Sequence, residues 1–142
     1  MIINKTNEAI INTKSIYIHD DILHDLVFNR KEHKLHLSLS TASKNDIYTI
    51  NYLDVLGFEM SSCDFWGWSP HIYHFVSLKL EEYTIIPKLM KNEHFDSAIE
   101  SSDIKEYMET KIIFTSGDEL VVACKSIEYN KANTKDGSVC SE

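Results

Sequence analysis

The stretch that decides the fold is residues 107–124, which read YMETKIIFTSGDELVVAC. Every second residue from Met108 to Phe114 falls on one side of an extended chain, the period-two pattern of a β-strand with one buried face. The tripeptide Ser-Gly-Asp then supplies turn residues, and an alternating apolar face resumes and runs to Cys124. We therefore expect a long β-hairpin over about 106–128.

Further strands are predicted upstream of this hairpin. Leucine occupies every second position of residues 34–40, KLHLSLS, which predicts a half-buried strand. Residues 22–28 carry apolar side chains, and the polar stretch 29–33 can turn the chain back, so we expect an antiparallel hairpin here as well. β-Favouring residues between 47 and 56 predict another strand, and residues 71–80 look extended.

Helical signals are short and few. Pro87 to Asn92 can form a short helix, because proline is tolerated at the first helical position, and residues 97–100 have the spacing of a capping box. These patterns predict an α+β fold, mostly antiparallel β-sheet or a partial barrel, with one or two short helices near 83–104. We expect a single β-rich domain over residues 1–129 and a flexible tail over residues 130–142.

Composition limits the classes of protein to consider. The chain has 142 residues, of which 43% are hydrophobic, enough to bury a continuous core. No stretch approaches the ~20 consecutive apolar residues of a membrane span, and residues 1–14 lack the features of a signal peptide. Three cysteines without a CxxC spacing indicate ordinary reduced thiols. We expect a cytoplasmic protein that does not bind membranes.

The charge pattern bears on the choice of partner. The formal net charge is -8, and Arg30 is the only arginine, which argues against nucleic acid as a ligand. Residues 81–110 alone contain eight acidic side chains and three lysines. Such a segment is either an ordinary solvated surface or an acidic face that steers a basic partner toward the protein.

Histidine-rich segments invite a metal hypothesis, which the expected geometry disfavours. Residues His19 to Asp25 contain two imidazoles and three carboxylates, the ligand types of zinc, iron or manganese. On a strand, however, His19 and His24 point to opposite faces, and the HxxH pairs at 33/36 and 71/74 diverge in extended chain. We therefore expect no metal site and no cofactor.

Nucleophilic catalysis has only weak candidates. Cys63, with His71 and His74 downstream, could form a thiolate–imidazole pair, and Ser116 carries a hydroxyl in the predicted turn. Neither lies in a known nucleophile signature, so no catalytic residue is assigned. Trp66 and Trp68 flank a glycine; they could anchor a partner, or they could close one end of the β core.

The order of these features resembles a known group of proteins. It combines Ile-His-Asp-Asp at 18–21, Leu-x-Leu-x-Leu at 35–39, Trp-Gly at 66–67 and the hairpin sequence at 112–124. Together these resemble small bacterial β-rich domains, many of them uncharacterised and some of them immunity proteins of polymorphic toxin systems. The resemblance implies a cytoplasmic, acidic protein that binds and blocks a toxin enzyme.

Our leading hypothesis is a non-enzymatic protein-binding domain, an immunity protein being one such domain, whose partner is a basic protein such as a toxin domain. We expect the acidic residues of 93–109 to steer that partner and the two tryptophans to anchor it. The side chains assigned to binding are Trp66, Trp68, Glu100, Asp103, Glu106 and Glu109.

Two alternatives from other classes stay open. One is a small-molecule-binding β-barrel or small enzyme whose pocket is lined by Tyr48, Tyr52, His24 and His36. The other is a homodimer in which the hairpin edge at 119–128 pairs with a second copy of the chain.

Overall fold

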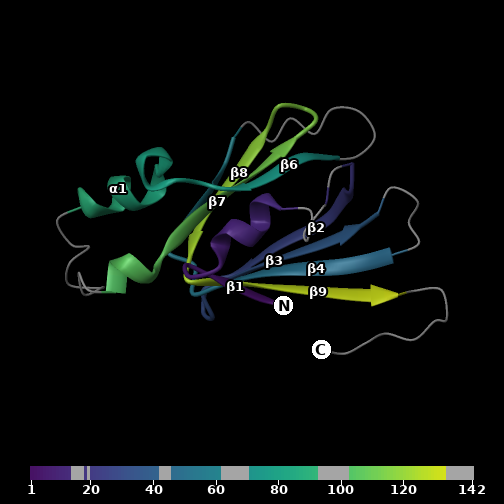
Figure 1. The fold of residues 1–142 in the computed structure, drawn as a ribbon, viewed down its shortest axis with the longest axis horizontal. Helices are drawn as coiled ribbons and strands as arrows, with labels where there is room; N and C mark the ends of the chain where they lie inside the picture. Colours follow the sequence, from purple (N-terminus) through teal and green to yellow (C-terminus); the bar gives the residue numbers. More distant parts are fainter. Residues whose placement is uncertain (14–17, 19, 42–45, 62–70, 93–102, 134–142) are drawn as a thin grey trace.

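Two antiparallel sheets make up most of the molecule (Figure 1). The computed structural model describes residues 1–13, 18, 20–41, 46–61, 71–92 and 103–133. The larger sheet has the order β1-β9-β4-β3-β2 and the smaller one β5-β8-β7-β6. The strands span Ile2–Asn4 (β1), Ile22–Asn29 (β2), Lys34–Ser40 (β3), Asp46–Leu53 (β4), Gly57–Met60 (β5), Ile72–Ser77 (β6), Met108–Phe114 (β7), Glu119–Cys124 (β8) and Ser126–Asn133 (β9).

Helical segments in the described residues are short. The one α-helix within the described ranges, α1, spans Ile85–Met90 and begins two residues before the proline at which the sequence predicted it to start. Three 3-10 helices span Glu8–Asn12 (η1), Leu80–Glu82 (η2) and Asp103–Glu106 (η3). The predicted fold class is confirmed: the described strands are antiparallel and form two open sheets rather than a closed barrel. The predicted capping box at 97–100 lies outside the described residues.

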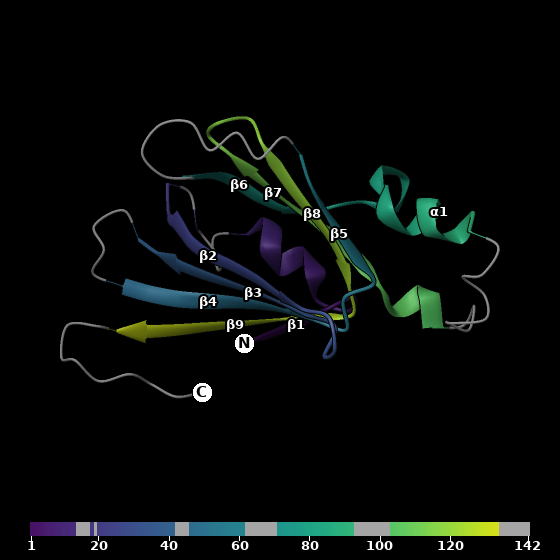
Figure 2. The ribbon, with the colours of Figure 1, turned by 180° about the vertical axis from the view of Figure 1, so that it is seen from behind.

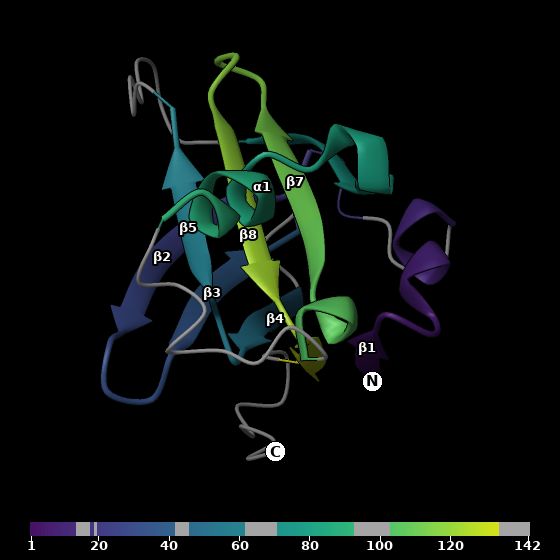
Figure 3. The same ribbon diagram turned by 90° about the vertical axis from the view of Figure 1, so that its left-hand side faces the viewer.

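The inner faces of the two sheets form the main core. The alternating leucines of β3 are fully buried, as are the alternating inward residues of β7 and β8. Burial of these alternating sets confirms both predicted hairpins, β2–β3 and β7–β8. Figure 3 shows the strands of the larger sheet running across those of the smaller one.

The chain passes between the sheets at two neighbouring corners. Residues 54–56 connect β4 to β5, and Lys125 alone connects β8 to β9. Asp54 adopts a φ of 53°, in the left-handed region that aspartate tolerates better than most residues. The Lys125 backbone N–H donates a hydrogen bond to the Leu53 carbonyl at 3.2 Å, so the two corners are tied together.

A second, smaller cluster covers the outer face of the smaller sheet. Helix α1 lies on the side of this sheet away from the larger sheet (Figure 2). The buried members of this cluster are Leu78, Tyr83, Ile85, Ile86, Tyr107 and Ala123. Gly57 permits this approach, because a Cβ at that position would lie 3.3 Å from Ile85 Cγ2. Small residues on the outward face of β5 and β8 thus form the seat of α1.

Two expectations about the C-terminal third are wrong. Residues 130–133 are not part of a tail: they continue β9 and pair with residues 46–49 of β4. Polar side chains hid this strand, because its outward positions face away from the core. The hairpin edge at 119–128 is not available to a second copy either, since β8 lies between β5 and β7, and β9 lies between β1 and β4.

Candidate functional site

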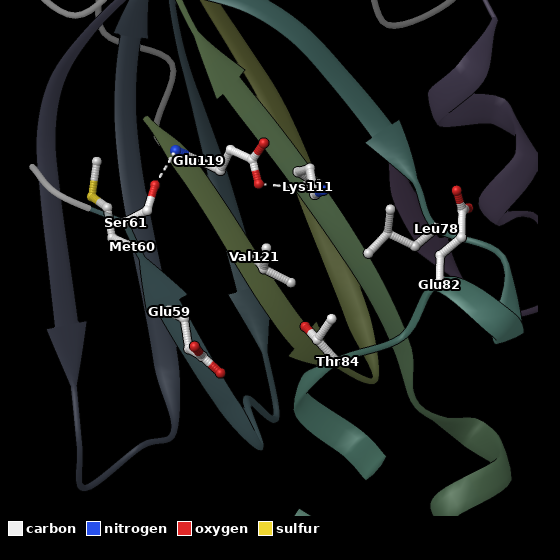
Figure 4. A pocket seen from close by; sticks show the side chains of 9 residues that line it. All are labelled: Glu59, Met60, Ser61, Leu78, Glu82, Thr84, Lys111, Glu119 and Val121. Atoms are coloured by element: carbon white, nitrogen blue, oxygen red, sulfur yellow. Dashed lines mark hydrogen bonds and ion pairs between the residues drawn. The ribbon is translucent and has the colours of Figure 1, made fainter. Parts of the chain in front are cut away.

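A pocket of about 290 Å³ opens on the outer face of the smaller sheet, beside the start of α1 (Figure 4). Strands β5, β7 and β8 provide one side of it, and the chain that leads from β6 into α1 provides the other. Its lining residues are Glu59, Met60, Ser61, Leu78, Glu82, Thr84, Lys111, Glu119 and Val121.

Strand pairing explains why these distant residues meet. Glu59 of β5 lies opposite Val121 of β8, and Lys111 of β7 lies opposite Val121 on its other side. The three side chains therefore form one row across the outer face of the sheet. Glu119 shares this face because it precedes Val121 by two residues on the same strand.

The pocket combines a surplus of carboxylates with apolar side chains. Its lining residues include three carboxylates and one ammonium, that of Lys111, whose Nζ lies 3.3 Å from Glu119 Oε1. Glu59 pairs with the exposed Lys88 at 3.6 Å, outside the lining set. Glu82 Oε1 accepts a hydrogen bond from the Lys79 backbone N–H at 2.8 Å. Met60, Leu78 and Val121 contribute apolar surface.

Glu109 holds the wall of this pocket in place. Its side chain is fully buried, and it accepts hydrogen bonds from the backbone N–H groups of Thr84 (3.0 Å), Ile85 (3.2 Å) and Ile86 (2.7 Å). These are N–H groups that the first turn of a helix leaves without helical partners, and a carboxylate suits them. The prediction that Glu109 is an exposed steering residue is therefore wrong.

The other residues assigned to binding are distributed differently. Glu106 is exposed and pairs with Lys125 at 3.6 Å. Asp103 begins η3. Trp66, Trp68 and Glu100 lie outside the described residues, so they stay a prediction.

Exposed charges in the described part of residues 81–110 are balanced. The described exposed acidic side chains there are Glu81, Glu82 and Glu106, and the exposed basic ones are Lys88, Lys91 and Lys105. The acidic surplus of this segment thus comes from the buried Glu109, from Asp103 and from the acidic residues between 93 and 100, outside the described part.

The four residues of the alternative His/Tyr pocket do not converge. Tyr48 and Tyr52 point into the core from β4, where burial raises the pKa of both phenols. The Tyr48 hydroxyl donates a hydrogen bond to Asp21 Oδ2. His36 lies on the opposite face, with its Nδ1 atom 2.6 Å from Asn51 Oδ1.

His24, the fourth of these residues, is exposed, and its Nε2 atom lies 2.7 Å from Ser40 Oγ. These four side chains therefore do not line one pocket.

The candidate metal ligands and nucleophiles that the structure describes do not form a site. Among the described residues, no three His, Cys, Asp or Glu side chains come together as a metal site, and His19 and Cys63 lie outside that set. Cys124 is fully buried, and burial raises the pKa of its thiol. The Ser116 hydroxyl donates a hydrogen bond to Asp118 Oδ2 at 3.0 Å inside the β7–β8 turn.

Sequence reasoning missed the pocket for a simple reason. Glu59, Glu82 and Glu119 come from three separate segments, and none of them lies in a motif. The alternation of β8 does place Glu119 and Val121 outward, so that part of the site was accessible from the pattern. The pairing of β5 with β8, which brings Glu59 to the site, could not be predicted from the pattern.

Comparisons with known proteins give little further information. No protein-family model matches the chain, and no curated protein matches it. The chain is similar to the crystal structure of an uncharacterized protein from Neisseria gonorrhoeae, with a TM-score of 0.49 and 15% sequence identity, over 91% of this chain and 96% of that one. Within the described residues, no helix has the length and apolar character needed to cross a membrane.

Proposed function

We propose that this chain is a non-enzymatic protein-binding domain, and that its pocket receives a lysine or arginine side chain from a basic partner. One observation carries the proposal: the pocket presents three carboxylates and one ammonium around a partly apolar surface. Lysine and arginine have an apolar stem and a cationic head, and they bury the stem while the head keeps polar contacts. The stem would lie along Met60, Leu78 and Val121, and the head would meet the carboxylates.

The size of the pocket favours a side chain over a large ligand. At about 290 Å³ it falls at the lower limit of the roughly 300–1,000 Å³ typical of sites that enclose drug-sized ligands. A single extended side chain needs less space than a nucleotide or a cofactor. The pocket therefore suits a group that is presented by the surface of another protein.

The energetics assign the pocket a role in recognition more than in total affinity. The Glu59 side chain is 53% exposed and that of Glu119 is 41% exposed, so each ion pair contributes only about 0.2 to 1 kcal/mol. Charge complementarity of this kind orients the partner and speeds association, while surrounding contacts supply most of the binding free energy.

A toxin enzyme with a basic surface is the partner class that the sequence resemblance suggests. If the chain is an immunity protein, it acts by occluding that enzyme and not by chemistry of its own. Two observations would test this role: a neighbouring gene that encodes a toxin with a basic domain, and restored growth when this chain is expressed together with that toxin. Growth arrest that persists despite soluble expression of both proteins would count against it.

The pocket itself can be tested without knowing the partner. We expect a short tri-arginine peptide to shift the backbone amide NMR signals of Glu59, Glu119 and Val121, whereas a tri-glutamine peptide leaves them unchanged. The double variant Glu59→Gln, Glu82→Gln should lower the affinity for the basic peptide about fivefold or more, in keeping with the loss of two partly exposed ion pairs.

Glu81→Gln is the matched control. Glu81 is an exposed neighbour of Glu82 but does not line the pocket, so its replacement removes one charge without touching the site. Equal weakening by Glu81→Gln and by Glu82→Gln would show that the peptide senses only the net charge, and it would remove the pocket from the proposal.

A further inference from the structure

Strand β2 is an edge strand of the larger sheet. It pairs with β3 on one side, and among the described residues its other side makes only the bridge between Ile22 and His71. The backbone from Asp25 to Asn29 therefore presents an edge that no described strand covers. Such an edge is a template for another strand.

Beyond the exposed Asp25 and the bulge beside it, this edge has little of the usual protection of sheet edges. Residues 25–29 read DLVFN and contain no proline or lysine, and the bulge of β2 lies before them, between Leu23 and Asp25. Val27 is 56% exposed and Phe28 is 37% exposed, so two adjacent large apolar side chains meet solvent here.

The other long edge strand, β6 of the smaller sheet, is better covered. β6 is hydrogen-bonded along its outer side at both ends: the Ile72 backbone N–H donates to the Asp21 carbonyl at 2.8 Å, and the Ser77 backbone N–H donates to Asn12 Oδ1 at 3.0 Å. Among the two longer edge strands, the exposed apolar backbone edge thus belongs to β2.

We propose that the β2 edges of two copies of this chain pair antiparallel, about a two-fold axis through Val27, to form one continuous sheet. In this register Val27 lies opposite Val27 of the second copy, Leu26 opposite Phe28, and Asp25 opposite Asn29. All three pairs are favourable or neutral, and no like charges meet. Phe28 already packs on Phe58, with ring centroids 5.0 Å apart, so the second copy's Leu26 extends an existing apolar cluster.

Local charge at this edge does not oppose self-pairing. Residues 25–34 contain three basic and two acidic side chains, although the whole chain carries a net charge of -8. Two copies can therefore meet at β2 without bringing two strongly acidic segments together.

Sedimentation velocity of the full chain is the first test. We expect a reversible monomer–dimer equilibrium at concentrations up to about 100 µM. Val27→Lys should weaken the dimer about tenfold or more, because it places two ammonium groups opposite each other at the axis. Tyr73→Lys is the matched control: Tyr73 is also 56% exposed but lies on β6, so its replacement should leave the dimer unchanged.

Mixing two variants tests the register directly. Val27→Lys and Val27→Glu should each dimerise more weakly alone than wild type, and a one-to-one mixture should restore the dimer, because residue 27 meets residue 27. Thermal unfolding of each variant by circular dichroism shows that the fold is retained.

Three outcomes would overturn the proposal. A monomeric wild type would leave the β2 edge to a strand of another protein. A dimer that Val27→Lys does not weaken would place the interface elsewhere. Variants that fold but do not dimerise on mixing would reject the register.

Discussion

The outer faces of the two sheets differ in what covers them. On the smaller sheet, outward positions of β5, β7 and β8 include small or apolar residues, and α1 packs there. On the larger sheet, no described helix packs on the outer face, whose outward positions are mostly polar. Examples are His36, Ser38, Thr49, Asn51 and Glu128.

The difference shows that the outward residues of a strand, and not only the inward ones, decide the architecture. An antiparallel sheet can face water on one side when that side is polar. An apolar outer side must be buried, and here α1 buries it together with Leu78, Tyr83 and Tyr107. The pocket exists because this cover is short and leaves part of the sheet beside Thr84 open.

The largest difference between the two faces is expected when Glu109, which holds α1 on the smaller sheet, is replaced. Glu109→Ala should lower the free energy of unfolding by about 2 to 4 kcal/mol, because three backbone N–H groups lose a charged acceptor. Urea unfolding measures the loss. Glu128→Ala, on the outer face of the larger sheet, should change stability by less than about 0.5 kcal/mol. Similar values for the two variants would contradict the distinction between the faces.

The core between the sheets offers an internal reference that neither outer face influences. Tyr48→Phe should cost about 1.5 to 3 kcal/mol, because it removes a hydrogen bond to the buried carboxylate of Asp21. Tyr52→Phe should be within about 0.5 kcal/mol of wild type or more stable, since the buried Tyr52 hydroxyl has no hydrogen-bond partner of ordinary geometry among the described residues. A large loss for Tyr52→Phe would mean that its hydroxyl has a partner in solution.

The same tyrosines predict an alkaline limit to stability. Burial raises the pKa of both phenols above their ordinary value of 10.0, so the folded state keeps protons that the unfolded state releases. Their contribution is complete below that pH and declines above it, by up to about 1.4 kcal/mol per pH unit for each tyrosine. Urea midpoints measured from pH 8 to about 11 should fall above 10, and less steeply in Tyr52→Phe.

A smaller effect is expected when the seat of α1 is overfilled. Gly57→Val should cost about 1 to 3 kcal/mol, because even the first carbon of a side chain would come within 3.3 Å of Ile85 Cγ2. Thr49→Val is the control on the larger sheet, where the added methyl group meets no described helix. A stabilised Gly57→Val would show that α1 moves freely away from the sheet.

The smallest effect concerns the polar face itself. Asn51→Ala should cost about 0.5 to 1.5 kcal/mol, through loss of the hydrogen bond to His36. Differential scanning calorimetry would detect it as a modest fall in Tm. A loss of stability as large as that of Glu109→Ala would contradict the expectation that the polar outer face contributes less to stability than the covered one.

Much of the fold could be predicted from strands whose alternation is complete. The inward positions of β3, β7 and β8 are apolar except for Thr110, and both of their hairpins were predicted, although the predicted β7–β8 hairpin runs on to residue 128, past the end of β8 at Cys124. β9 was not predicted as a strand of its own: residues 126–128 were assigned to this hairpin and residues 130–133 to a tail, and only pairing with β4 defines the strand. Local sequence cannot show which strand a polar segment will join.

The site shows the limit more clearly. Glu109 lies at an outward position of its strand, which reads as exposed, yet a later layer of the structure buries it. Whether an outward glutamate meets water or a helix depends on where α1 docks, and that position depends on Gly57, fifty-two residues earlier in the chain. The same long-range packing assembles the three pocket carboxylates.

The paired corners at Asp54 and Lys125 determine which wall of the pocket is rigid and which can move. Strands β5 and β8, on one side of the pocket, each continue into the larger sheet within three residues, so this wall is held rigidly. The facing wall is supported by a helix of six residues, which Glu109 holds through hydrogen bonds to backbone N–H groups. If the pocket receives a side chain as proposed, one that needs more room will displace the helix before it moves the strands, and the hydrogen bonds of Glu109 will limit the size of the side chain that fits.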